Sequence, residues 1–121
     1  QKIEVIGLMK DADLGLQILD NIPAFYHGTS PNKFFDYIAA GLPVLNNYPG
    51  WIAGLIAKYD CGFPIKPSDP EIFADKLIFA AENPNKLKQM GVNAAKLSKK
   101  EFDIEILKAK FVKCFEEVKN L

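Results

Sequence analysis

The chain has 121 residues, with 15 basic and 15 acidic side chains, so its formal net charge is zero. Its 49% hydrophobic and 25% charged residues are an ordinary globular composition, which argues against a disordered chain, and its length fits one domain of ~100–150 residues. A balanced charge argues against a nucleic-acid binder, and no apolar run approaches the ~20 residues of a membrane span.

The first quarter of the chain predicts a helix, a strand and a long loop. Apolar residues recur at helical spacing in residues 2–10, although their alternation also leaves a strand open. Residues 13–19 are short and apolar, as expected of a parallel strand that is covered on both faces, and Gly15 suggests the close approach of a neighbouring backbone. The loop 20–29 exceeds the 2–6 residues typical of α/β connections, and loops of such length are often functional.

A helix with two marked ends follows this loop. Ser30 or Thr29 can cap its first free amides, and Pro31 fits the first helical position, where a missing N–H costs nothing. Gly41 can take the left-handed conformation that ends a helix, and Pro43 prevents the helix from resuming.

The same helix has two unlike faces. Its apolar face consists of Phe34, Phe35 and Ile38. Its polar face carries Asn32, Lys33 and Asp36 and begins at a helix N-terminus, where free N–H groups and the helix dipole favour an anion. Because the loop before it should leave the carboxyl end of a parallel strand, where open α/β sheets bind ligands, a ligand site is predicted there.

Two more strands and a helix are predicted in the middle of the chain. Residues 43–47 form the second strand, and residues 51–58 form a helix with its apolar side chains on one face. Residues 61–65 form the third strand, which Pro64 places at an edge of the sheet or at a strand end.

The final third of the chain is predicted to be helical, over residues 70–82, 84–98 and 101–119. The first of these helices has either Ser68 or Asp69 as its N-terminal cap. Its predicted inward side chains are Phe73, Leu77, Ala80 and Ala81. The last helix carries an apolar stripe opposite its solvated lysines and glutamates, formed by Ile104, Leu107, Phe111, Cys114, Phe115 and Val118.

The expected fold is one partial α/β domain, residues 1–121, with a Rossmann-like three-layer parallel sheet and a helical C-terminal third. Three strands are few for an open parallel sheet, so the sheet is expected to be incomplete. An unprotected sheet edge would then favour self-association. Cys61 and Cys114 form no Cys-x-x-Cys pair, and both are predicted to be buried, reduced thiols of a cytoplasmic protein.

The segment Ser-Pro-Asn-Lys-Phe-Phe-Asp-Tyr-Ile-Ala-Ala-Gly-Leu-Pro-Val, residues 30–44, resembles the donor-binding helix of retaining glycosyltransferases with two Rossmann-like domains. This is the GT-B group called glycosyltransferase family 4, or glycosyl transferases group 1. The family carries two acidic residues with seven residues between them. The second falls on Asp36 and the first on Gly28, which has no side chain. The resemblance continues along nearly the whole chain.

The resemblance implies the C-terminal half of a GT-B enzyme, without the N-terminal acceptor domain. The whole enzyme would transfer a hexose or aminosugar from a nucleoside diphosphate to a glycan or lipid-linked acceptor, in the biosynthesis of cell-surface polysaccharides. The resemblance implies no cofactor and no essential metal. It also implies a cytoplasmic enzyme, with peripheral attachment to the inner face of the membrane left open. The fragment alone is expected to be inactive.

The resemblance also assigns roles to individual residues. Asp36 would accept hydrogen bonds from the ribose hydroxyls, which suits a carboxylate. Backbone amides of the first helical turn, with Lys33 as a point charge, would hold the diphosphate. The predicted donor-binding residues are Asp36, Ser30, Asn32, Lys33, Thr29, Gly28 and His27. No catalytic residue is identified, and a lone histidine supports neither a metal site nor a nucleophilic triad.

Simpler explanations and other functions stay open at this stage. Asp36 and Lys33 can form a local ion pair, Ser30 can be only a cap, and Asn32 and His27 can face solvent. The aromatic side chains of Tyr48 and Trp51 can line a pocket or pack beneath a loop. The alternatives in function are a sugar-nucleotide epimerase of the same architecture and a non-catalytic α/β interaction domain.

Overall fold

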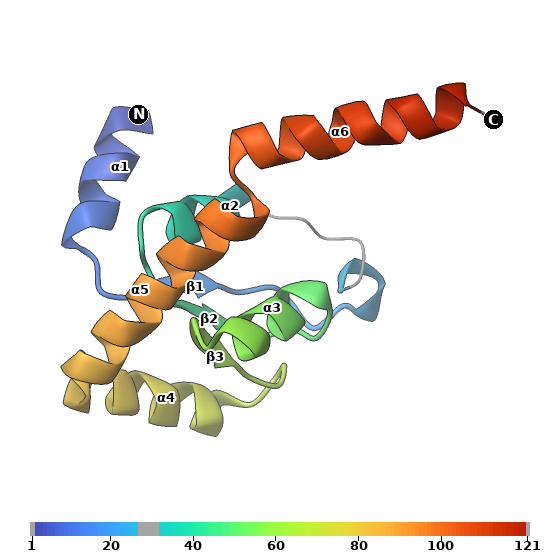
Figure 1. Ribbon diagram of the computed structural model, residues 1–121. Helices are drawn as coiled ribbons and strands as arrows, with labels where there is room; N and C mark the ends of the chain where they lie inside the picture. The colour runs from blue at the N-terminus through green and yellow to red at the C-terminus, as the bar shows by residue number, and fades with distance from the viewer. Residues whose placement is uncertain (1, 27–31, 121) are drawn as a thin grey trace.

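A computed structural model of the chain describes residues 2–26 and 32–120. Three short parallel strands form one sheet in the order β1-β2-β3 (Figure 1). The elements in chain order are α1 (Lys2–Asp11), β1 (Gly15–Gln17), a 3₁₀ turn (Pro23–Phe25), α2 (Asn32–Ala39), β2 (Val44–Asn46), α3 (Trp51–Tyr59), β3 (Gly62–Pro64), α4 (Pro70–Glu82), α5 (Pro84–Glu101) and α6 (Ile104–Lys119). The predicted α/β class, the three parallel strands and the helical final third are therefore confirmed.

The sheet separates two apolar clusters because successive side chains of a strand point to opposite faces. Val44 packs with Phe34 and Ile38 of α2 and with α3 on one face. Leu45 packs with Phe63 and the inner residues of α4 on the other. α5 contributes to both clusters, with Leu87 and Met90 in the second and Ala94 and Leu97 in the first. It passes the amino ends of the strands, where Gly91 lies against Gly41 and Pro43.

Two of the local signals that mark helix ends in the sequence, at the end of α2 and at the start of α4, hold in the structure. Gly41 has a φ of 74° and ends α2 in the left-handed conformation. Asp69 caps α4, since its Oδ1 accepts a hydrogen bond from the Ile72 amide at 3.1 Å, and Pro70 follows at the first helical position. Asp69, and not Ser68, is therefore the cap. Residues 2–11 form a helix, which settles the open choice between helix and strand.

Strand β1 corrects two predictions. It is not covered on both faces, because Leu16 and Ile18 are exposed while Gln17 is buried. Only the face toward α2 is covered. The close neighbour of Gly15 is a side chain and not a backbone, since a Cβ at Gly15 would lie 2.6 Å from the ring of Tyr37. Tyr37 also donates a hydrogen bond from its hydroxyl to the Leu16 carbonyl at 3.2 Å.

Three predictions of burial in the C-terminal third are wrong. On α4, Leu77 and Ala81 are exposed, and Ala80 is the buried residue. Cys114 is exposed, whereas Cys61 is buried as predicted. The whole apolar stripe of α6 lies on the surface, because α6 extends away from the sheet (Figure 1) and buries none of its residues among the described parts of the chain.

Candidate functional site

The polar face of α2 is exposed at the carboxyl edge of the sheet, the edge where the three strands end. Asn32, Lys33 and Asp36 are all exposed, whereas Phe34 and Ile38 on the opposite face are fully buried. Among the described residues, Lys33 and Asp36 do not form an ion pair with each other or with another side chain. Both charged groups are therefore available to a ligand.

The other predicted donor-binding residues cannot be placed. His27, Gly28, Thr29 and Ser30, together with Pro31, lie outside the described residues. Their predicted roles in capping α2 and in holding a phosphate stay predictions.

Three buried polar side chains lie beneath this edge, and two of them, Gln17 and Asn46, were not predicted from the sequence as candidate site residues. Gln17 at the end of β1 is 5% exposed, Asn46 at the end of β2 is 0% exposed, and Tyr48 is 1% exposed. Gln17 and Asn46 are paired residues of the parallel ladder and share the face of Gly15 and Val44, which is covered by α2 and α3. Within the described structure, Gln17 Oε1, Asn46 Nδ2 and the Tyr48 hydroxyl have no hydrogen-bond partner.

These three groups create an unusual polar environment. Buried polar atoms are nearly always paired, and each unpaired one costs about 1–3 kcal/mol. Burial raises the pKa of the Tyr48 phenol, and the neighbouring Gln17 side chain acts in the opposite direction, although the two groups do not meet in hydrogen-bonding geometry. One signal in the sequence pointed to this cluster, because Gln17 and Asn46 interrupt otherwise apolar strands.

Side chains from β2 and the following turn hold the segment that leaves β1. Asn47 makes two hydrogen bonds to the backbone of Leu19, one accepted by Oδ1 at 2.8 Å and one donated by Nδ2 at 2.9 Å. Tyr26 stacks on Tyr48 with ring centroids 6.2 Å apart, and its hydroxyl donates a hydrogen bond to Asn21 Oδ1. These contacts attach the segment that leaves β1 to the end of β2 and to the turn that follows it.

The start of α3 completes the edge. Gly50 precedes this helix with a φ of 133°, and a Cβ there would lie 2.6 Å from the Tyr26 carbonyl oxygen, so the turn and the loop touch through backbone. Trp51 is partly exposed and lies against the aromatic rings of Phe35 and Phe102. The sequence left open whether Tyr48 lines a pocket or packs beneath a loop. In the structure Tyr48 is buried, and its ring stacks on that of Tyr26.

A small recess of about 250 Å³ opens between the ends of β2 and β3 and the start of α4. Its polar lining includes Asn47, Lys66 and the cap residue Asp69. This recess adds a second cationic side chain to the carboxyl edge, which sequence reasoning missed because Lys66 lies in an irregular segment.

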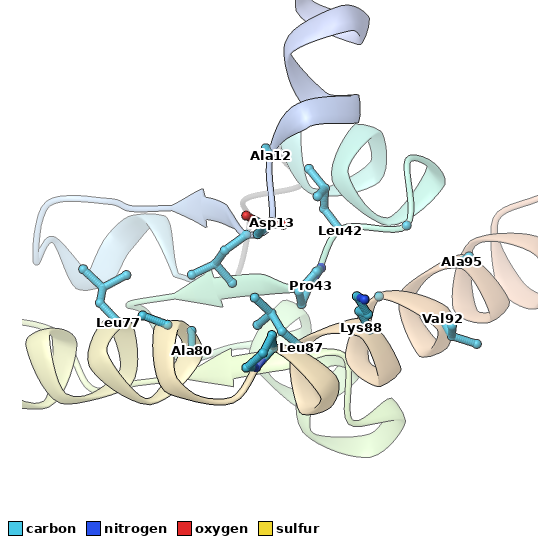
Figure 2. A pocket seen from close by; sticks show the side chains of 15 residues that line it. Ala12, Asp13, Leu42, Pro43, Leu77, Ala80, Leu87, Lys88, Val92 and Ala95 are labelled. Carbon is cyan, nitrogen blue, oxygen red and sulfur yellow. The ribbon is translucent and has the colours of Figure 1, made fainter.

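The larger hollow lies at the opposite edge of the sheet (Figure 2). It measures about 860 Å³ and is mainly apolar, and it lies between the amino ends of β1 and β2 and the helices α4 and α5. Leu42, Leu77 and Leu87 project around it, and Asp13 and Lys88 are its charged side chains. We call it the amino-edge groove. The three predicted donor-binding residues that the structure describes, Asn32, Lys33 and Asp36, do not line it.

Comparisons of the chain with models of known protein families, with curated proteins and with solved structures found no match. Among the described residues, no three His, Cys, Asp or Glu side chains gather where they could hold a metal ion. No helix in the described ranges is long and apolar enough to cross a bilayer.

Proposed function

We propose that the chain binds a nucleoside diphosphate sugar at the carboxyl edge of its sheet, as the donor-binding part of a glycosyltransferase. The observation that carries the proposal is the exposed polar face of α2, with Lys33 and Asp36 one turn apart and free of ion pairs within the described chain. The resemblance of residues 30–44 to a donor-binding helix points to the same face.

Each group on this face suits one part of such a ligand. The first amides of a helix have no partner within the helix, and together with the helix dipole they favour a diphosphate. The Lys33 ammonium adds a cation in the same turn, and the Asp36 carboxylate accepts hydrogen bonds from ribose hydroxyls. The donor sugar and its base stay open.

The buried polar cluster of Gln17, Asn46 and Tyr48 supports a site at this edge. Two strands of a parallel sheet would normally bury apolar residues at these positions, so the cost of the unpaired atoms calls for a compensating role. Ordered waters between these side chains and the ligand would supply the missing hydrogen bonds.

Donor binding does not require the chain to complete the reaction by itself. Transfer to a glycan or lipid-linked acceptor, as the resemblance implies, takes place between two domains, so we expect the 121-residue chain to bind the donor without turnover. A sugar-nucleotide epimerase of the same architecture would bind a similar ligand. A non-catalytic interaction domain would bind none.

Calorimetric titration with uridine diphosphate and guanosine diphosphate tests the proposal. At least one nucleotide should bind, and Asp36→Asn should weaken it roughly 10- to 100-fold, because a hydrogen bond to a charged group is worth ~1.5–3 kcal/mol. Lys33→Ala should lower the affinity of the chain for the nucleoside diphosphate and leave its affinity for the bare nucleoside unchanged.

Two exposed residues elsewhere supply matched controls. Asp75→Asn on α4 and Lys96→Ala on α5 make the same chemical changes away from the polar face of α2, and they should leave the affinity unchanged. Equal affinities in Asp36→Asn and in the native chain, or no binding of either nucleotide, would contradict the proposal.

A further inference from the structure

Helix α6 carries an apolar face that nothing in the described chain covers. The exposed fractions of Ile104, Leu107, Phe111, Phe115 and Val118 lie between 44% and 69%, where an inward face would be close to zero, and no residue of α6 is buried. Figure 1 shows α6, in red, extending from the end of α5 away from the sheet. Contiguous exposed apolar surface of this kind marks an interaction site.

The spacing of these residues indicates the shape of the missing partner. Ile104, Phe111 and Val118 are seven residues apart, and Leu107 and Cys114 fall three residues after the first two. This is the alternating three- and four-residue spacing of a coiled-coil seam, in which one helix packs along another. The stripe therefore fits a second helix rather than a flat surface or a small molecule.

We propose that α6 pairs in antiparallel orientation with α6 of a second copy of this chain. In the register that sets Phe111 opposite Cys114 and Leu107 opposite Val118 of the other copy, the four layers that these residues form are apolar. The charges that border the seam also match, because Lys110 of each copy then lies near Glu117 of the other. The pair of contacts is reciprocal, as a two-fold interface requires.

Lys110 can leave its present ion-pair partner at little cost. Lys110 Nζ lies 3.8 Å from Glu101 Oε2 in its own chain, and the Lys110 side chain is 62% exposed, so this contact is long and solvated. If Lys110 turns toward a second copy, only this weak ion pair with Glu101 is lost.

The antiparallel orientation follows from the position of α6 in the fold. The rest of the chain joins α6 at its N-terminus, so a parallel pair would bring both folded bodies together at one end. An antiparallel pair separates them along a helix of 16 residues, or about 24 Å. In a parallel seam the bordering charges would be Asp103 and Lys108, and Asp103 already accepts a hydrogen bond from the Glu105 amide.

Sedimentation velocity over a range of concentrations tests the pairing. The native chain should shift from its 13.5 kDa monomer toward twice that mass. Because the seam is short, we expect a dissociation constant of roughly 10–1,000 µM. Phe111→Glu should stay monomeric at all concentrations. Val112→Glu is its matched control, because it removes the next exposed apolar residue, which lies outside the seam, and adds the same charge.

Two further variants test the register and the orientation. Lys110→Glu should weaken association, and adding Glu117→Lys should restore it. In a Cys114→Ser background, Leu107→Cys combined with Val118→Cys should form disulfide-linked dimers on mild oxidation, whereas the native Cys114 should not. Since α6 has no buried residue, unchanged melting of the body shows that these variants fold.

Several results would overturn the proposal. These are a native chain that stays monomeric at millimolar concentration, a dimer that Phe111→Glu leaves intact, and efficient cross-linking through Cys114 alone. The second result would assign association to the free edge of β1 or to the amino-edge groove, and the third would indicate a parallel pair.

Discussion

The two cysteines show how the same residue type takes opposite environments in one small chain. Cys61 follows α3 and is fully buried in the cluster shared by α2, α3 and α5. Burial, and secondarily the charge of Asp60, raises the pKa of its thiol from 9.0 to about 11. Cys114 lies on the exposed seam of α6. Their sequence contexts do not distinguish them, because each lies in an apolar pattern whose covering partner is not visible locally.

The shift at Cys61 predicts a loss of stability in alkali. Between pH 9 and 11 the folded chain retains the Cys61 proton while the unfolded chain releases it, so the free energy of unfolding falls as the pH rises through this interval. A shift of this size amounts to ~2–3 kcal/mol at most. Urea unfolding at several pH values should show this fall in the native chain and a smaller one in Cys61→Ala. If the free energy of unfolding fell equally with pH in the two proteins, the loss of stability could not be assigned to Cys61.

Other single residues were predictable where the cause of their role is local. Gly41 and Asp69 end and begin their helices for reasons that lie within a few residues, and both act as predicted. Gln17 and Asn46 were not predictable as a pair, because their contact depends on the register of two strands that are far apart in sequence. Lys33 and Asp36 were predicted to share one exposed face of a helix, and they do. Their exposure does not indicate which ligand they bind.

At the scale of elements, the packing of α2 against α5 depends on a glycine contact. A Cβ at Gly91 would lie 2.5 Å from the Gly41 carbonyl oxygen, which is backbone and cannot move aside. Gly54 in α3 has nothing within 4 Å of a Cβ. Both residues are helical, so alanine brings the same helix-propensity gain of ~0.5–1 kcal/mol at either position.

The two substitutions are therefore expected to have opposite signs. Gly54→Ala should raise the free energy of unfolding by up to about 1 kcal/mol, whereas Gly91→Ala should lower it by about 1–2 kcal/mol through overpacking. Denaturant unfolding of both variants measures the difference. A stabilising Gly91→Ala would mean that the close contact between α2 and α5 does not exist in solution.

The elements themselves were largely predictable, and their surroundings were not. Periodicity and end signals locate the helices because a helix is a local structure, and short apolar runs bounded by turns locate the strands. An apolar stripe indicates that a face needs cover without indicating what supplies it. Leu77, Leu16 and the stripe of α6 were therefore expected to be covered, yet they face solvent.

At the scale of the whole molecule, the two edges of the sheet have different chemistry. The carboxyl edge gathers Lys33, Asp36, Lys66 and the buried polar cluster, whereas the amino-edge groove is larger and mainly apolar. Size alone would favour the groove as a ligand site. Charge and hydrogen-bonding groups favour the carboxyl edge for a nucleoside diphosphate, because a diphosphate needs cations and free amides.

Amide chemical-shift mapping by NMR, with uridine diphosphate and guanosine diphosphate titrated into the native chain, tests this choice most directly. We predict saturable shifts at the start of α2 and around Asn47 and Gly50, with the groove residues Gly41 and Gly91 unmoved. Shifts confined to the amino-edge groove, or no shifts with either nucleotide at millimolar concentration, would contradict a donor site at the carboxyl edge.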